Sequence, residues 1–112
     1  MPIEILFLTP DLQRLCEQQT LAVRKLGADS ARKLRARLAD LSAAATVSAL
    51  AAGHPHPLKG DRVGQFAVSL AGGARLVFEP ANDPVPLVAR GGSVDWTRVT
   101  RVRVVFVGDY HD

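Results

Sequence analysis

The sequence predicts an α+β domain in which an N-terminal strand and then a helical hairpin pack on one face of a mostly antiparallel sheet of four to five strands. Three observations support this prediction. A short apolar run opens the chain, apolar residues then recur at helical spacing, and the spacing becomes alternating after Gly64. Local turns join the later strands, so these strands should pair antiparallel and leave one face of the sheet free of helices.

Length and composition predict one cytoplasmic domain spanning 1–112. The 47% hydrophobic and 22% charged content is ordinary for a globular protein, and no apolar run approaches the roughly 20 residues of a membrane helix. A single cysteine excludes an internal disulfide and fits a reducing compartment, and the N-terminus lacks the features of a secretory signal. The net charge of +3 indicates an anionic partner only weakly.

The first half of the chain predicts a strand and two helices. Residues 3–8 are apolar and rich in strand formers. Thr9 can cap a helix that begins at Pro10 and runs to the glycine at position 27. A second helix should start at Asp29 or Ser30. Its expected apolar positions are Ala31, Leu34, Leu38, Leu41 and Ala45.

The second half predicts strands over 65–70, 74–79 and 99–107. Ala71-Gly72-Gly73 is typical of the hairpin turn between the first two. Residues 80–98 hold three prolines and are expected to be irregular, with a short strand at 85–89 and Trp96 as an anchor. In the last strand, alternation places Val102, Val104 and Phe106 on one face and Arg101, Arg103, Val105 and Val107 on the other.

Two polar clusters stand out from this framework, His56-Pro-Leu-Lys-Gly-Asp-Arg and the final Asp109-Tyr-His-Asp. We expect the fold to bring them together on the face away from the helices. That face should also carry Arg75, Glu79, Arg101 and Arg103. Continued alternation adds Asp109 and His111 to it, unless a bulge at Gly108 shifts the strand.

Such a constellation suits cleavage of RNA without a metal or other cofactor. The residues concerned are His56, Lys59, Arg75, Asp109, Tyr110 and His111. One imidazole would take the proton of the 2′-hydroxyl, and another would donate a proton to the leaving 5′-oxygen. A guanidinium or ammonium group would stabilise the phosphorane-like transition state.

Four stretches together resemble the RelE/ParE toxin superfamily, and within it the HigB-like proteins of the plasmid maintenance killer and "killer suppression" type. They are HPLKGDR at 56–62, Gly64-Gln-Phe, Ala74-Arg-Leu-Val-Phe and Gly108-Asp-Tyr-His. The resemblance implies a RelE-like fold and a toxin of a bacterial type II toxin–antitoxin pair. Such toxins act as mRNA interferases, which are endoribonucleases that cleave mRNA on the ribosome, inhibit translation and are held inactive by an antitoxin, commonly a helix-turn-helix protein. The chain departs from the pattern in Ala74, where relatives often carry an aromatic residue, and in its longer 80–98 segment.

The resemblance also implies roles for individual residues. His56 and His111 would be the proton-transfer pair, Arg75 would stabilise the transition state, Asp109 would orient an imidazole, and Tyr110 would contact the nucleotide. The expected substrate-binding residues are Lys59, which the resemblance implies, and Arg62, Arg101 and Arg103. Alternatively, Arg62 pairs with Asp61 or holds its turn, and Arg101 and Arg103 keep an edge strand soluble.

Other interpretations of the same residues remain open. A metal site formed by His54, His56 and His111 is one alternative, although no carboxylate or thiolate has a characteristic spacing, and we expect no metal. Cys16 fits a buried apolar position better than a nucleophile. A catalytically silent member of the superfamily would act only by binding a protein, either its antitoxin or a gyrase-type target.

Overall fold

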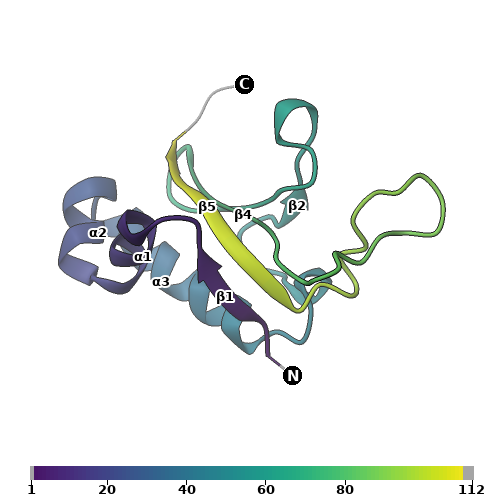
Figure 1. Ribbon diagram of the computed structural model, residues 1–112. Helices are drawn as coiled ribbons and strands as arrows, with labels where there is room; N and C mark the ends of the chain where they lie inside the picture. The colour runs from purple at the N-terminus through teal and green to yellow at the C-terminus, as the bar shows by residue number, and fades with distance from the viewer. Residues whose placement is uncertain (1, 110–112) are drawn as a thin grey trace.

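The structure is a computed structural model that describes residues 2–109. In this part of the chain one five-stranded sheet has the order β1-β5-β4-β3-β2, and three α-helices pack together against one of its faces (Figure 1). The strands are β1 (Glu4–Phe7), β2 (His56–Pro57), β3 (Phe66–Ser69), β4 (Ala74–Pro80) and β5 (Arg101–Asp109). The helices are α1 (Pro10–Glu17), α2 (Gln19–Leu26) and α3 (Ala28–Ala43), with the 3₁₀ turns η1 (Val47–Ala49) and η2 (Gly60–Arg62).

The sheet is antiparallel except at one edge. There β1 runs parallel to β5, with Ile5 opposite Val102 and Phe7 opposite Val104. The other neighbouring pairs are antiparallel, as the short turns between them require. The predicted fold class, an N-terminal strand followed by helices on a mostly antiparallel sheet, is confirmed.

The first helical segment is divided, contrary to the single helix expected between Pro10 and Gly27. The predicted start is confirmed, because the Thr9 Oγ1 accepts a hydrogen bond from the Leu12 N–H at 3.2 Å. Gln18, however, is extended, with φ −110° and ψ 105°, and it separates α1 from α2. The break allows α1 to pack on β1 and β5 while α2 packs on α3.

The predicted helical hairpin is confirmed between α2 and α3. Gly27 ends α2 and precedes α3 with φ +87°, a conformation that glycine adopts at little cost. Ala31, Leu34 and Leu41 of α3 are buried against the sheet. No helix within residues 2–109 combines the length and the apolarity needed to cross a membrane.

An aromatic cluster closes one end of the core. The Phe66 ring lies 5.5 Å from that of Phe78 and 4.8 Å from that of Trp96, measured between centroids. Phe78 is fully buried, and Trp96 packs against the same cluster from the long segment before β5. Trp96 therefore anchors that segment, as predicted.

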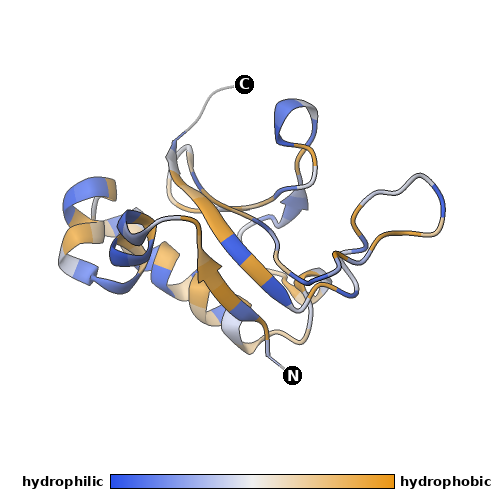
Figure 2. Cartoon of the chain, in the orientation of Figure 1, coloured by the Kyte–Doolittle hydropathy of each residue, from blue (hydrophilic) through white to orange (hydrophobic). Residues whose placement is uncertain are grey.

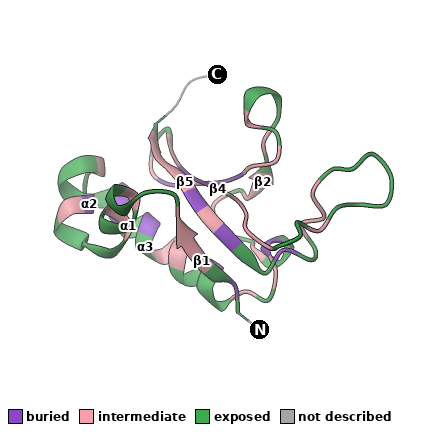
Figure 3. Cartoon of the chain, in the orientation of Figure 1, coloured by how far each residue is buried: buried purple, intermediate pink, exposed green. Residues whose placement is uncertain are grey.

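The segment at 82–98, hereafter the arm, projects from the sheet and is mostly exposed (Figure 3). The strand expected at 85–89 is wrong, because only a single bridge joins Leu87 to Val94. The Arg98 guanidinium holds the base of the arm by donating to the Leu87 carbonyl at 2.8 Å and to Asp95 at 2.9 Å. Prolines at 84 and 86 leave too few N–H donors for a ladder.

A β-bulge interrupts β5. Val77 of β4 pairs with Phe106, whereas the next residue, Phe78, pairs with Val104, so that Val105 is an extra residue. The first half of β5 alternates between hydrophilic and hydrophobic residues, as Figure 2 shows, and the extra residue reverses that alternation beyond it.

The bulge overturns part of the predicted face assignment. Val107 pairs with the fully buried Leu76 and packs on the core, although it was expected on the opposite face. Phe106, expected in the core, lies on the face away from the helices, where the guanidinium of Arg62 covers its ring. Asp109 follows Val107 by two residues, so it too belongs to the helical side.

Candidate active site on the helix-distal face

The sheet face away from α1, α2 and α3, hereafter the helix-distal face, carries most of the predicted site residues. Pairing across the strands places His56, Ala67, Val77 and Phe106 in one row on this face. A second row contains Ser69 and Arg75 with Gly108, and a third contains Glu79 with Arg103. The predicted alternation on β4, with Arg75 and Glu79 pointing away from the helices, is confirmed.

The middle of this face is covered by residues 58–65, hereafter the covering loop. Its ends are joined by a hydrogen bond from the Leu58 N–H to the Gln65 carbonyl at 2.9 Å, and η2 lies between them. The Arg62 guanidinium carbon reaches to 5.1 Å from the centroid of the Phe106 ring. Ala67 and Val77 have no exposed surface although they face away from the helices, so this side of the sheet is also covered at its middle. The uncovered face expected from the sequence is therefore limited to the parts around this loop.

His56 lies at one edge of the sheet, on the two-residue strand β2, and is half-buried. Its Nδ1 is 2.8 Å from the carbonyl oxygen of His54. A carbonyl only accepts hydrogen bonds, so this contact requires a proton on Nδ1. In the neutral ring the lone pair is then on Nε2, which is the arrangement of a base.

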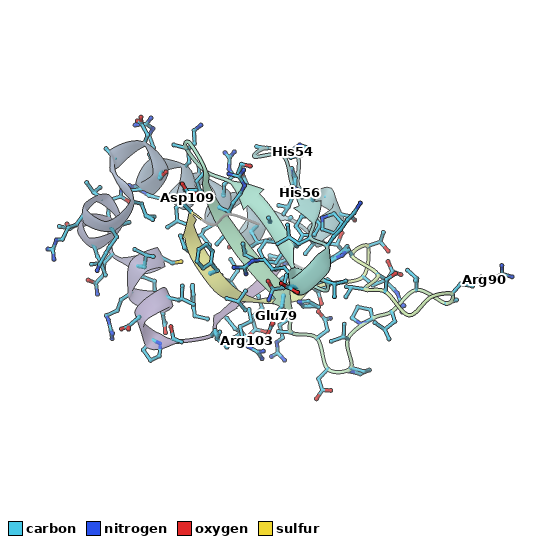
Figure 4. All side chains as sticks on the ribbon, turned by 90° about the horizontal axis from the view of Figure 1, so that it is seen from above. His54, His56, Glu79, Arg90, Arg103 and Asp109 are labelled. Carbon is cyan, nitrogen blue, oxygen red and sulfur yellow. The ribbon has the colours of Figure 1, made fainter. Side chains whose placement is uncertain are left out.

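His54 lies beside His56, with 4.9 Å between the ring centroids (Figure 4). Two imidazoles alone do not make a metal site, because structural and catalytic sites use three or four protein ligands. Within residues 2–109 no group of three or more His, Cys, Asp or Glu side chains is arranged to hold a metal ion.

Arg75 is half-buried on β4. It precedes by two residues Val77, the β4 member of the row that contains His56. Its Nη1 donates to the Ala74 carbonyl at 3.1 Å. In the described part of the chain no carboxylate forms an ion pair with Arg75, so its positive charge is not neutralised by an adjacent acid.

The other predicted cations differ in their surroundings. Lys59 is exposed at the start of η2, and Arg62 of the same turn donates to Gln65 Oε1 at 3.2 Å.

Arg103 of β5 donates to Glu79 at 2.7 Å on the helix-distal face, so its charge is paired. Arg101 donates to Glu4 of β1 at 2.8 Å, and this hydrogen bond and charge raise the pKa of Arg101. Arg101 lies on β5, and β4 and β3 separate that strand from β2, which carries His56.

Asp109 does not join His56 and Arg75, and its expected position on the helix-distal face is wrong. Because of the bulge, it pairs with Ala74 on the helical side, and its carboxylate lies against Gly73 of the hairpin turn. Figure 4 shows Asp109 toward the helices and apart from the two histidines. The backbones of His56 and the end of β5 are three strand spacings apart, about 14 Å before side chains are considered.

Asp109 instead lines a pocket of about 840 Å³ between the helices and the β3–β4 turn. Leucines from α1 and α2 form its apolar wall, and Ser30 fixes the turn by donating to the Ala71 carbonyl at 3.2 Å. Asp11, Arg14, Lys25 and Asp109 supply charge at the lining. Nothing in the sequence pattern predicts this pocket, because the bulge that directs Asp109 into it falls at a valine, an ordinary strand residue.

Tyr110 and His111 lie outside the described residues, so their predicted roles stay predictions. The structure adds Phe106 to the candidate site, a residue assigned to the core from the sequence. Within residues 2–109, the site thus combines a histidine at the sheet edge, an unneutralised arginine on β4, and an arginine that lies over an aromatic ring.

Two comparisons with known proteins give no family assignment, since neither a protein-family model nor a curated protein matches this chain.

Proposed function

We propose that this protein is a metal-independent endoribonuclease, the toxin of a bacterial type II toxin–antitoxin pair that acts in the cytoplasm on mRNA at the ribosome. Its partner in the resting state would be a cognate antitoxin, best sought as a helix-turn-helix protein encoded beside it. Two lines of support are the resemblance described above and the chemistry of the helix-distal face.

The placement of His56 supports the proposal most directly. Its Nδ1 is committed to a carbonyl, so Nε2 is the atom that can accept the proton of a ribose 2′-hydroxyl. Attack by the resulting oxygen on the adjacent phosphorus forms the new bond, and the bond to the 5′-oxygen breaks. The leaving oxygen needs a proton. With His56 as the base, this step falls to His111, the other member of the proton-transfer pair that the resemblance implies.

Cations on the same face would stabilise the charge that develops on the phosphate. Arg75 forms no ion pair with a carboxylate of residues 2–109 and lies on β4, in the row next to that of His56, so it is the main candidate. Lys59 and Arg62 on the covering loop would bind neighbouring phosphates. Arg103, already paired with Glu79, and Arg101, paired with Glu4, are weaker candidates.

The test is induced expression followed by mapping of the 5′ ends of cellular RNA. Wild type should arrest growth and create new ends within translated mRNA. His56→Gln should lower cleavage by about 10²–10⁴-fold if it removes the base. Arg75→Gln should lower it strongly while leaving thermal unfolding unchanged, because its side chain points away from the core.

Arg32→Gln is a matched control for Arg75→Gln. Arg32 is exposed on α3, and among residues 2–109 its ion pair is with Asp29 of the same helix. Its replacement removes the same charge without touching the helix-distal face. Wild-type cleavage by the His56 variant, or equal losses in the two arginine variants, would contradict the proposed mechanism.

A second candidate function is binding of a protein partner without catalysis. The pocket of about 840 Å³ beside α1 and α2 supports it, since an apolar wall with a few charges suits a bound ligand or segment. If expression arrests growth but the RNA ends are unchanged, and Leu12→Asp on the pocket wall relieves the arrest, this function replaces the nuclease.

A further inference from the structure

We propose that His54 is a positioning residue that fixes which nitrogen of His56 carries the proton. This role rests on the proposed function, in which His56 is the base. The contacts that support it are all within the protein: the hydrogen bond between His56 and the His54 carbonyl, and the attachments of this segment to β3. It concerns a residue for which the resemblance to known toxins assigns nothing.

The contact between the two residues is specific in direction. His56 Nδ1 and the His54 carbonyl oxygen are 2.8 Å apart, a normal length for a hydrogen bond. Only the Nδ1–H tautomer of His56 can make this bond while the ring is neutral. The opposite tautomer would place a lone pair against the carbonyl oxygen and a proton on the nitrogen that must act as the base.

The backbone of His54 is unusual in a way that favours this contact. Its φ is +49°, the left-handed region, and no other residue besides glycine has a positive φ between positions 2 and 109. The next residue is Pro55, and a residue before proline ordinarily adopts extended backbone. Strain of this kind persists only where the surroundings fix the chain, and it occurs often at functional sites.

The chain is fixed on both sides of His54. Before it, the Gly53 carbonyl accepts a hydrogen bond from the Ser69 N–H at 2.7 Å. After it, His56 pairs with Ala67 in the sheet. The left-handed turn at His54 thus lies between two attachments to β3, and it directs the carbonyl toward the following imidazole.

The role belongs to the backbone of His54 more than to its ring. The two rings are tilted by 43° with centroids 4.9 Å apart, a contact that limits ring motion but does not select a tautomer. Glycine at position 54 should therefore preserve the effect, because it retains the carbonyl and accepts a positive φ. Valine should abolish it, because a β-branched residue strongly disfavours that conformation.

Nitrogen-15 NMR of the imidazoles in the full chain tests the proposal. The samples are wild type, His54→Gly, His54→Val and the milder His54→Ala, and His56→Gln and His111→Gln variants assign the signals. Wild type and His54→Gly should show the Nδ1–H tautomer of His56. His54→Val should lose it, and His54→Ala should fall between. An Nε2–H tautomer in wild type overturns the proposal even if the valine variant does not fold.

Cleavage of RNA by the same samples separates this proposal from the proposed function. Relative to wild type, His54→Gly should cleave within about threefold and His54→Val at least about tenfold more slowly, since general base catalysis contributes about 10²–10⁴-fold. Full cleavage by a folded His54→Val protein with the altered tautomer overturns the positioning role. If no sample, wild type included, cleaves RNA, the nuclease proposal fails while the tautomer measurement still decides what His54 does to His56.

Discussion

The guanidinium carbon of Arg62 lies 5.1 Å from the centroid of the Phe106 ring, so the covering loop contacts the last strand across the sheet. This contact depends on the bulge at Val105, which turns Phe106 away from the helices. A cation over an aromatic face is attracted by the ring quadrupole, by about 0.5–1 kcal/mol at exposed sites. The contact therefore links the position of the loop to the register of β5.

A double-mutant cycle with Arg62→Met and Phe106→Leu should reveal this link. Arg62→Met removes the cation and Phe106→Leu removes the aromatic ring, and each replacement leaves an apolar side chain in its place. We expect a coupling free energy of unfolding of about 0.5–1 kcal/mol, measured by urea denaturation. Additive effects of the two substitutions would show that the two groups do not interact in solution. Phe106→Tyr, which retains an aromatic face, should keep the coupling.

Gly53→Ala should destabilise the protein and weaken cleavage together. A Cβ at this position would lie 2.5 Å from Val68 Cγ1 and 3.1 Å from the Ser69 carbonyl oxygen, and φ is +85°. The loop that carries His54 and His56 must then move away from β3. We expect a loss of unfolding free energy of about 1–3 kcal/mol, measured by thermal or chemical denaturation.

Gly91→Ala is the matched control, since Gly91 has the same φ of +85° but a Cβ there would have no atom within 4 Å. It lies near the tip of the exposed arm, far along the chain from the histidines. The variant should lose only the free energy of the strained backbone conformation, about 1 kcal/mol, and should cleave RNA normally. Equal losses in both variants would mean that the close approach at Gly53 is unimportant.

The single cysteine offers a test of the helical layer. Burial of Cys16, with a smaller contribution from Glu17, raises the pKa of its thiol from 9.0 to about 12. The neutral thiol is thus favoured in the folded state, so its contribution to stability is complete below pH 9 and is lost as the pH rises toward 12. At about pH 8 iodoacetamide should alkylate the native protein about a thousandfold more slowly than the urea-unfolded chain. Similar rates in both states would show that the thiol is accessible and ionised normally.

Much of the fold follows from local sequence patterns. The Thr9 cap and the Ala71-Gly72-Gly73 turn each depend on nearby residues, and each is found as predicted. The apolar stripe of α3 is found as far as Leu41, whereas Ala45 is exposed and lies beyond the end of the helix. Alternation in β4 also places Arg75 on the correct face. These features depend little on the rest of the chain.

The errors arise where distant segments decide the geometry. Gln18 divides the first helix so that α1 and α2 can pack on different elements, and no proline or glycine marks the break. The bulge at Val105 has no local signal either, yet it exchanges the faces of Phe106, Val107 and Asp109. One extra residue in β5 thus separates Asp109 from His56, although strict alternation predicts that the two lie on the same face.

Asp109→Asn should therefore cleave RNA within a few fold of wild type, in contrast to the loss expected for His56→Gln. The Asp109 carboxylate lies against Gly73 and lines the pocket on the helical side, where it cannot orient the His56 ring. The amide keeps the size of the side chain and removes only its charge. Cleavage of a defined mRNA in a translation extract gives the rates of both variants, and circular dichroism checks their fold. A loss in Asp109→Asn as large as that in His56→Gln would mean that β5 lacks the bulge in solution and that Asp109 reaches the helix-distal face.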